Sequence, residues 1–255
     1  MGAGIAVVSA EPKIRVGIGG WVYPPWRGVF YPPGLRQADE LAHASRQVTA
    51  IEINGTFYGA QKPASFRRWY GETPENFVFS VKGPRFATHR SDLATAGPSI
   101  DRFFGSGVLE LRDKLGPILW QFAARLPFDE GNVASFLELL PRNLDGREIR
   151  HVVEVRHRSF ASAPFIELLR RHRVAVALVD DGLFSPLEDI ASDFIYARLR
   201  RCAEEEPTGY SFDALDAWAE RFRGQVTQRD CFVYFINGAK VRAPAAAQAF
   251  LQRLT

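Results

Sequence analysis

The sequence predicts a single-domain α/β protein, a (β/α)8 TIM barrel with parallel strands and a ligand site at the carboxyl ends of those strands. Eight short apolar runs alternate with helix-like segments, which is the pattern of repeated βα units. The length of 255 residues matches the roughly 250 residues typical of such barrels. No Pro-, Gly- and Ser-rich linker divides the chain. We therefore expect residues 1–12 to be a flexible N-terminal lead and residues 13–255 to be one domain.

Each predicted strand is short and rich in Val, Ile, Phe or Tyr, and several are almost continuously apolar. That composition favours strands covered by helices on one side and packed against other strands on the other. The predicted strands are Ile14–Trp21, Ala50–Phe57, Phe77–Pro84, Gly116–Phe122, His151–His157, Val174–Asp181, Phe194–Arg200 and Cys231–Asn237.

The intervening segments place apolar residues at helical spacing. Phe136 and Leu140 fall on one stripe, for example, and Pro141 follows them as a stop signal. The predicted helices are Gln37–Gln47, Ala64–Tyr70, Ile100–Asp113, Asn132–Leu140, Pro164–His172, Leu187–Ala191, Ser211–Arg223 and Ala245–Leu254. An open doubly wound sheet is the rival architecture. The GIGG string at Gly17–Gly20 is not its dinucleotide-binding fingerprint.

Bulk composition is that of an ordinary soluble globular protein, with 46% hydrophobic and 24% charged residues. A net charge of +3 does not by itself indicate a nucleic-acid binder. Cys202 and Cys231 have no metal-like spacing, and so few cysteines favour a reducing compartment. No apolar run approaches the ~18 residues of a membrane helix, and the start lacks the features of a signal peptide. We expect a cytoplasmic protein without a membrane partner; the oligomeric state stays open.

Polar side chains collect where the predicted strands end. Because strand side chains alternate between two faces, Glu52 and Asn54 share one face, while Ile51 and Ile53 share the other. We expect the polar set to line the upper barrel, where chemistry in such barrels is located. The candidate site residues are Trp21, Tyr23, Glu52, Asn54, Lys82, Arg85, His89, Gln121, Glu154, Arg156, His157, Asp180, Arg198, Arg200 and Asn237.

Four of these residues are candidate catalytic groups. Glu52, Glu154 and Asp180 carry carboxylates suited to general acid–base chemistry. Lys82 in an apolar barrel can act as a base or form a Schiff base, although a nearby Glu52 is expected to keep it charged. The alternative interpretation is a purely structural network of charges. In it Glu52 and Lys82 neutralise each other across adjacent strands, and Glu154 and Arg156 do the same with Arg198 or Asp180.

The remaining candidates indicate a ligand. Arg85, Arg156, Arg198 and Arg200, with Lys82, favour an anionic group such as a carboxylate or phosphate. The aromatic residues Trp21, Tyr23, Trp26, Phe57 and Tyr58 offer a stacking surface for a sugar or base. No metal-binding motif is present and the cofactor is unknown. A Mg²⁺ or Mn²⁺ site built from Glu52, Glu154 and Asp180 stays open.

Three functions fit these residues. The first is an enzyme that acts on a small anionic or sugar-like molecule by carboxylate acid–base chemistry, of hydrolase or lyase/isomerase type. The second is a nucleic-acid-binding or phosphodiester-processing protein, which requires one continuous basic rim containing Arg85, Arg90, Arg158 and Arg201. The third is a non-catalytic ligand-binding module.

Several long stretches resemble the domain-of-unknown-function family seventy-two, the YecE-like TIM barrels. They are IRVGIGGWVYPPWRGVFYPPGL (14–35), AIEINGTFYG (50–59), FVFSVKGPRFATH (77–89), DKLGPILWQF (113–122), VVEVRHRSF (152–160) and DFIYARL (193–199). The resemblance implies the barrel fold and a pocket, but no settled reaction. The pocket it implies comprises Trp21, Glu52, Asn54, Lys82, Arg85, His89, Gln121, Glu154, Arg156 and His157.

Two segments depart from the pattern of the family. After the seventh strand, Arg200 stands where a His is usual, and the acidic stretch RLRRCAEEEPTGYS (198–211) follows. After the eighth strand, family members usually carry a Gly-His-Ala-Pro stretch and an Asn-Ala pair. The corresponding segment here is INGAKVRAPAAAQAF (236–250), with Arg242 and Ala246 near those positions. Either the ligand differs from that of the family, or part of the site has been lost.

Overall fold

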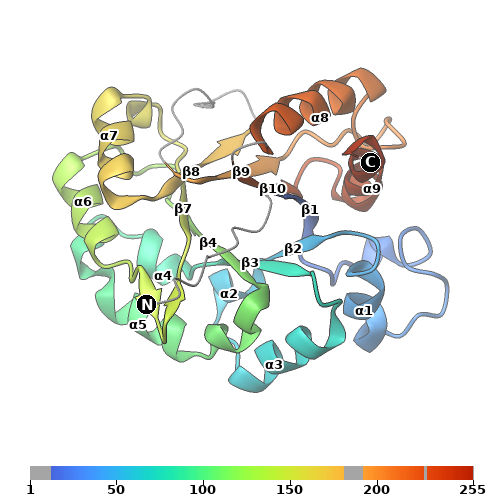
Figure 1. Cartoon of the computed structure of the whole chain (residues 1–255), viewed down its shortest axis with the longest axis horizontal. Helices are drawn as coiled ribbons and strands as arrows, with labels where there is room; N and C mark the ends of the chain where they lie inside the picture. Colours follow the sequence, from blue (N-terminus) through green and yellow to red (C-terminus); the bar gives the residue numbers. More distant parts are fainter. Residues whose placement is uncertain (1–12, 181–191, 227–228, 255) are drawn as a thin grey trace, which may run out of the picture.

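Eight parallel strands close into a barrel in a computed structural model that describes residues 13–180, 192–226 and 229–254. Around the ring the order is β1, β10, β9, β8, β7, β4, β3 and β2, so neighbours in the chain are neighbours in the barrel. Figure 1 shows these strands at the centre, with helices around them. The strands are β1 (Ile14–Gly19), β2 (Ala50–Ile53), β3 (Val78–Lys82), β4 (Leu115–Gln121), β7 (His151–Glu154), β8 (Ala175–Val179), β9 (Phe194–Leu199) and β10 (Asp230–Phe235).

The helices follow the strands as the TIM-barrel prediction requires. The α-helices are α1 (Glu40–Ala44), α2 (Gly55–Tyr58), α3 (Pro63–Glu72), α4 (Arg85–Thr88), α5 (Gly97–Gly105), α6 (Glu130–Glu138), α7 (Ala163–His172), α8 (Phe212–Val226) and α9 (Ala243–Leu254). Short 3-10 turns are η1 (Pro24–Trp26), η2 (Gln37–Asp39), η3 (Leu93–Ala96), η4 (Val108–Lys114), η5 (Arg158–Phe160) and η6 (Lys240–Arg242). The predicted helix at Leu187–Ala191 and the expected lead at 1–12 lie outside the described residues. No helix in the described ranges is long and apolar enough to cross a membrane.

One predicted helix is wrong. The segment Ile100–Asp113 was expected to be continuous, but α5 ends at Gly105 and η4 begins at Val108. Between them Gly107 has a φ of +98°, a conformation that favours glycine. A Cβ at Gly107 would lie 2.7 Å from the Cα of Pro63, so the turn also lets the start of α3 approach closely.

A small hairpin was missed. β5 (Asn143–Leu144) and β6 (Arg147–Glu148) pair antiparallel around Asp145 and Gly146, both of which have positive φ. Two such residues are the mark of a tight hairpin turn, and Asp-Gly is its usual sequence. The Asp145-Gly146 dipeptide therefore indicates this hairpin in the sequence itself.

The predicted alternation of faces is confirmed. Ile51, Ile53, Val153, Val155, Ala197 and Leu199 belong to the apolar core between strands and helices. Inside the barrel a second core is built from Ala50, Leu119, Val152, Ala175, Ala177, Val179, Phe194, Tyr196, Phe232, Tyr234 and Ile236. Because these side chains fill the lower and middle barrel, the polar residues that follow them on the same faces lie nearer the carboxyl ends.

Gly17 on β1 shows why that interior closes. A Cβ at this position would lie 2.1 Å from the carbonyl oxygen of Ala50 and 3.1 Å from the Tyr234 ring. The absent side chain is thus replaced by Tyr234, whose hydroxyl lies 2.7 Å from Ser80 Oγ across the barrel. The glycine at position 17 is therefore explained by tight packing inside the barrel.

His151 begins β7 at the opposite end of the barrel from the candidate site. It is 3% exposed, and its Nδ1 accepts a hydrogen bond from Trp120 Nε1 at 3.1 Å. Since indole only donates, His151 Nε2 carries the proton and donates to the Pro141 carbonyl at 2.8 Å. Burial lowers the pKa of His151 to about 4, although the bond to Pro141 opposes this shift.

We expect this histidine to weaken the fold in mild acid. Between pH 6.5 and pH 4, His151 binds a proton in the unfolded chain but stays neutral in the folded protein. The free energy of unfolding therefore falls by about 3 kcal/mol as the pH falls through this range. Urea unfolding of wild type and of His151→Phe at several pH values measures this effect. The free energy of unfolding of wild type, relative to that of the variant, should fall as the pH falls from 6.5 to 4. A difference between the two proteins that does not change with pH contradicts a buried, neutral His151.

Candidate functional site

Arg198 on β9 lies at the centre of the upper barrel and binds two buried glutamates. Its Nε and Nη2 donate to Glu52 Oε2 and Oε1 at 2.9 and 3.0 Å, and its Nη1 donates to Glu154 Oε2. Glu52 comes from β2 and Glu154 from β7, and both are fully buried. The ion-pair partner of Glu52 is therefore Arg198, which reaches it from β9, and not Lys82 on the adjacent strand.

Further donors occupy the remaining carboxylate positions. Tyr196 donates to Glu52 Oε2 at 2.7 Å, while Gln121 Nε2 and Arg156 Nε donate to Glu154 Oε1 at 2.7 and 3.0 Å. We call these six residues the central network: Glu52, Gln121, Glu154, Arg156, Tyr196 and Arg198. Every glutamate oxygen in it accepts at least one hydrogen bond from the protein.

The charges of the central network fix its protonation. Burial alone raises the pKa of Glu154, but Arg198 and Arg156 outweigh it and lower that pKa to about 2. The pKa of Arg198 is raised, because both glutamates overcome the cost of its burial. A carboxylate that is ionised and fully hydrogen-bonded at neutral pH has no proton to donate, so the geometry argues against Glu154 as a general acid.

Lys82 ends β3 at the edge of this network. Its Nζ donates to Gln121 Oε1 at 2.9 Å and lies 3.9 Å from the centre of the Phe57 ring. Its backbone carbonyl accepts from Thr56 Oγ1 at 2.6 Å. Burial and the nearby Arg198 lower the pKa of Lys82 to about 8, against the opposing effect of Glu52 and Glu154. A useful fraction of Lys82 is therefore neutral near physiological pH.

A cluster of cations surrounds His89 on the loop after β3. Burial lowers the pKa of His89, and so do the charges of Lys82, Arg125, Arg156 and Arg85, in that order. The four charged groups named here are all positive, so their effects on the pKa of His89 add up. Arg125 was missed by the sequence analysis; it lies four residues beyond Gln121 and belonged to a loop without a motif.

The first of two pockets at the mouth lies over the ends of β1 and β2. This aromatic pocket has a volume of 270 Å³. Trp21 and Trp69 meet edge to face there with ring centres 5.1 Å apart, beside the amides of Asn54 and Gln61. The lining residues are Gly19, Gly20, Trp21, Val22, Ile53, Asn54, Gly55, Gln61, Trp69 and Lys240.

The second pocket lies over the ends of β9 and β10. This basic pocket has a volume of 380 Å³ and is lined by Arg200, Arg201, Asn237, Gly238 and Lys240. With its amide oriented to satisfy both groups, Asn237 accepts from Arg200 Nη2 and Nε at 3.1 and 3.2 Å. Lys240 lines both pockets, so they adjoin. Its Nζ lies 4.7 Å from the centre of the Tyr23 ring, and burial lowers its pKa.

Two predicted site residues, Asp180 and His157, form hydrogen bonds with loop residues and not with the central network. Asp180 accepts hydrogen bonds from the backbone N–H of Arg200 at 2.6 Å and from the Tyr210 hydroxyl at 2.6 Å. His157 Nδ1 lies 2.7 Å from Ser159 Oγ at the start of η5. Asp180 makes no hydrogen bond with the central network, and the described residues hold no cluster of three or more His, Cys, Asp or Glu that suits a metal.

The segments that depart from the family pattern shape the basic pocket. Arg200 stands in the pocket itself, and Arg242 Nε donates to the Glu204 carbonyl at 3.1 Å, which holds the acidic loop. Gly209 has a φ of +68°, and a Cβ there would lie 3.2 Å from that of Ala246. Arg242, Gly209 and Ala246 thus lie close together beside the acidic loop.

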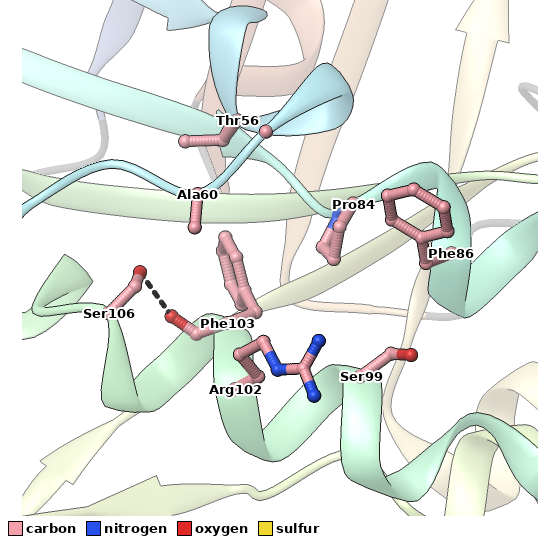
Figure 2. A pocket seen from close by; sticks show the side chains of 9 residues that line it. Thr56, Ala60, Pro84, Phe86, Ser99, Arg102, Phe103 and Ser106 are labelled. Carbon is pink, nitrogen blue, oxygen red and sulfur yellow. Dashed lines mark hydrogen bonds between the residues drawn. The ribbon is translucent and has the colours of Figure 1, made fainter.

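A third pocket lies outside the mouth, between the end of α2 and α5 (Figure 2). It has a volume of 160 Å³, and Figure 2 shows the Phe103 ring pointing into it between Ala60 and Pro84. Arg85 is exposed nearby on α4, 5.4 Å from the centre of the Phe86 ring. This outer pocket is mainly apolar and holds none of the predicted site residues.

Comparison with known proteins agrees with the fold and the resemblance. The family model described as "Protein of unknown function DUF72" matches residues 15–255. The UPF0759 protein YunF of Bacillus subtilis (strain 168) is 28% identical over 159 residues, which are 60% of this chain and 54% of YunF. The chain thus aligns with about half the length of that curated relative.

Solved structures add the architecture. A DUF72 family protein of Thermotoga maritima MSB8 superposes with a TM-score of 0.76 at 23% identity, covering 94% of this chain and 98% of that one. A xylose isomerase-like TIM barrel/4-hydroxyphenylpyruvate dioxygenase fusion protein gives a TM-score of 0.54 at 15% identity, over 94% of this chain and 42% of that one. At these identities the two structures establish the fold alone. With its family model matched over nearly the whole described barrel, the chain belongs to the DUF72 family.

Proposed function

We propose that this protein is an enzyme that acts on a small, anionic, sugar-like substrate bound in the barrel mouth. The observation that carries the proposal is the pair of adjoining pockets that share Lys240. One offers aromatic rings and amides, the other two arginines. A phosphorylated sugar has both complementary parts within one small molecule.

The aromatic pocket suits a hydroxylated ring. The apolar face of a sugar packs on indole, and amide groups such as those of Asn54 and Gln61 can both donate to and accept from hydroxyls. Gly20 has a φ of +76°, and a Cβ there would meet nothing within 4 Å. The backbone of this loop is therefore open to close approach by a ligand.

The basic pocket suits the anion. Arg200 is held by Asn237, so its planar guanidinium is oriented before a ligand arrives. Arg201 also lines this pocket; its side chain is exposed, and its backbone N–H donates to the Tyr210 hydroxyl at 2.8 Å. Charge-assisted bonds from such groups recognise phosphate and carboxylate.

Lys82 is the best-supported group for proton transfer. The hypothesis of carboxylate acid–base chemistry named Glu52 and Glu154, but both are occupied by Arg198 and its neighbours. In this proposal Glu154 holds Gln121 and Arg156 in place, and Lys82 transfers the proton. A pKa of about 8 is close to the working pH, as acid–base catalysis requires.

Titration calorimetry with ribose 5-phosphate, ribose and inorganic phosphate tests the binding half of the proposal. The phosphorylated sugar should bind more tightly than either part. Trp21→Ala should weaken its binding about tenfold. Arg201→Gln should weaken it between about tenfold and a hundredfold, because a hydrogen bond to a charged group contributes about 1.5–3 kcal/mol. Phe212→Ala, which changes an exposed residue on α8, is the matched control. Binding unchanged in both pocket variants contradicts the proposal.

A nucleic-acid-binding or phosphodiester-processing protein is the alternative. Its predicted rim required Arg90, but that guanidinium donates to the carbonyl oxygens of Phe86 and Thr95 and is engaged within its own loop. Arg85, Arg158 and Arg201 are exposed. Salt-dependent binding of single-stranded DNA that Arg158→Gln weakens, with sugar phosphate binding unaltered, favours this alternative. The third hypothesis, a non-catalytic module, is favoured if sugar phosphates bind but none is turned over.

A further inference from the structure

We propose that Lys82 is a covalent catalyst, whose amine forms a Schiff base with an aldehyde or ketone of the substrate. This inference rests on the proposed function and adds a requirement to it: the anionic, sugar-like substrate must expose a carbonyl carbon, as open-chain sugar phosphates and 2-oxo acids do.

The arrangement of hydrogen bonds leaves Lys82 free of a carboxylate partner among the described residues. Two buried glutamates lie near enough to influence it, yet Arg198 occupies both. An objection raised by the sequence, that Glu52 would keep Lys82 charged, is thereby weakened. The amine is held instead by a neutral amide and an aromatic ring.

Gln121 fixes the direction of the amine. Its Nε2 donates to Glu154 Oε1 at 2.7 Å, so its Oε1 must face Lys82. An amide oxygen accepts hydrogen bonds only, so one N–H of neutral Lys82 points at Gln121. Phe57 covers a second side of Nζ. The lone pair is then directed away from Gln121, and the Lys82 side chain is 7% exposed, so it is not completely enclosed.

Lys114 shows what a buried structural lysine looks like in the same chain. It is 4% exposed, and its Nζ lies 4.4 Å from the centre of the Tyr70 ring. Its three donors are all satisfied, by the carbonyls of Tyr70 and Thr73 and by Thr73 Oγ1 at 2.6, 2.8 and 3.1 Å. Both lysines are therefore buried beside an aromatic ring. They differ in hydrogen bonding, since Lys114 donates to three oxygens and Lys82 to one among the described residues.

The covalent step balances with water and one proton. Neutral Lys82 Nζ attacks the carbonyl carbon, a C–N bond forms, and a proton moves from nitrogen to the former carbonyl oxygen. The carbinolamine takes up one proton from solvent and loses that oxygen as water, which leaves a protonated imine. Arg156, half-buried beside Glu154, is close enough to Lys82 to lower its pKa and can attract the carboxylate of a short 2-oxo acid such as glyoxylate.

Borohydride trapping with glyoxylate tests this step in the full-length protein. Borohydride adds hydride to the imine carbon and makes the bond permanent, and peptide mass spectrometry locates it. The chain has five lysines, at positions 13, 62, 82, 114 and 240. At pH 7.5, which lies within the useful range of neutral Lys82, we expect Lys82 to be labelled at least about tenfold faster than Lys13, Lys62 and Lys114.

Two variants sharpen the result. Lys82→Met should remove the fast label and leave the slow ones. Arg156→Gln should slow labelling by glyoxylate but not by uncharged glycolaldehyde, which separates loss of anion attraction from loss of fold. Labelling of Lys82 no faster than that of Lys62 overturns the proposal. If ribose 5-phosphate still binds in that case, the proposed function stands and only the covalent step fails. If Lys82 is labelled fast but no sugar phosphate binds, the covalent step stands and the proposed substrate class fails.

Discussion

Arg198→Met should destabilise the protein by about 3–5 kcal/mol, the usual cost of leaving buried charges without their partner. Arg198 is 4% exposed and contacts two glutamates with no exposed surface. Removing it leaves Glu52 with only Tyr196, and Glu154 with Gln121 and the half-buried Arg156. Urea unfolding monitored by circular dichroism measures the loss.

Two controls separate this effect from a general sensitivity to mutation. Arg171→Met breaks an exposed pair with Glu130 and should cost less than about 1 kcal/mol. Adding Glu52→Gln and Glu154→Gln to Arg198→Met removes all three charges and should recover much of the lost stability, because no buried charge is then unpaired. An Arg198→Met cost no larger than that of Arg171→Met contradicts the account of the central network.

Lys82→Met should lower kcat/KM by about 100-fold or more, within the range known for general acid–base groups. The measurement follows turnover of ribose 5-phosphate, glucose 6-phosphate and fructose 6-phosphate by NMR. In wild type the rate should rise with pH and level off above about 8, because the neutral amine is the active form. The thermal stability of the variant should be close to that of wild type, since Lys82 has no ion pair with any residue that the structure describes.

Lys62→Met is the matched control for this variant. Lys62 is exposed before α3, so its removal should leave both rate and pH profile unchanged. A rate in Lys82→Met within about threefold of wild type would contradict the role given to Lys82. A flat pH profile in wild type would do the same, because it would mean that no group with a pKa near 8 controls the reaction.

The barrel could be predicted from the sequence because strand-like alternation and helix-like spacing of apolar residues followed each other regularly along the chain. Alternation along the strands placed Ile51 and Ile53 outside and Glu52 inside, and the structure has that arrangement. Local breaks were harder: the turn at Gly107 depends on contact with Pro63, which lies 44 positions earlier in the chain and cannot be read from a helical stripe.

Pairing inside the barrel could be predicted only in part. The sequence offered Lys82 as a partner of Glu52, and Arg198 or Asp180 as partners of Glu154 and Arg156; Arg198 does bind Glu154. Its planar guanidinium also binds both oxygens of Glu52 through Nε and Nη2, a contact that strand adjacency does not indicate. Lys240 and Arg125 were missed because they stand in loops, where no periodicity marks the direction of a side chain; both matter only once the loops are placed over the barrel.

A crystal structure of the wild-type protein soaked with ribose 5-phosphate tests the central claim most directly. The account predicts the sugar against Trp21 in the aromatic pocket and the phosphate beside Arg201 and Lys240 in the basic pocket. Density for the ligand only in the outer pocket near Phe103, or no bound ligand at concentrations that saturate binding in solution, would contradict it.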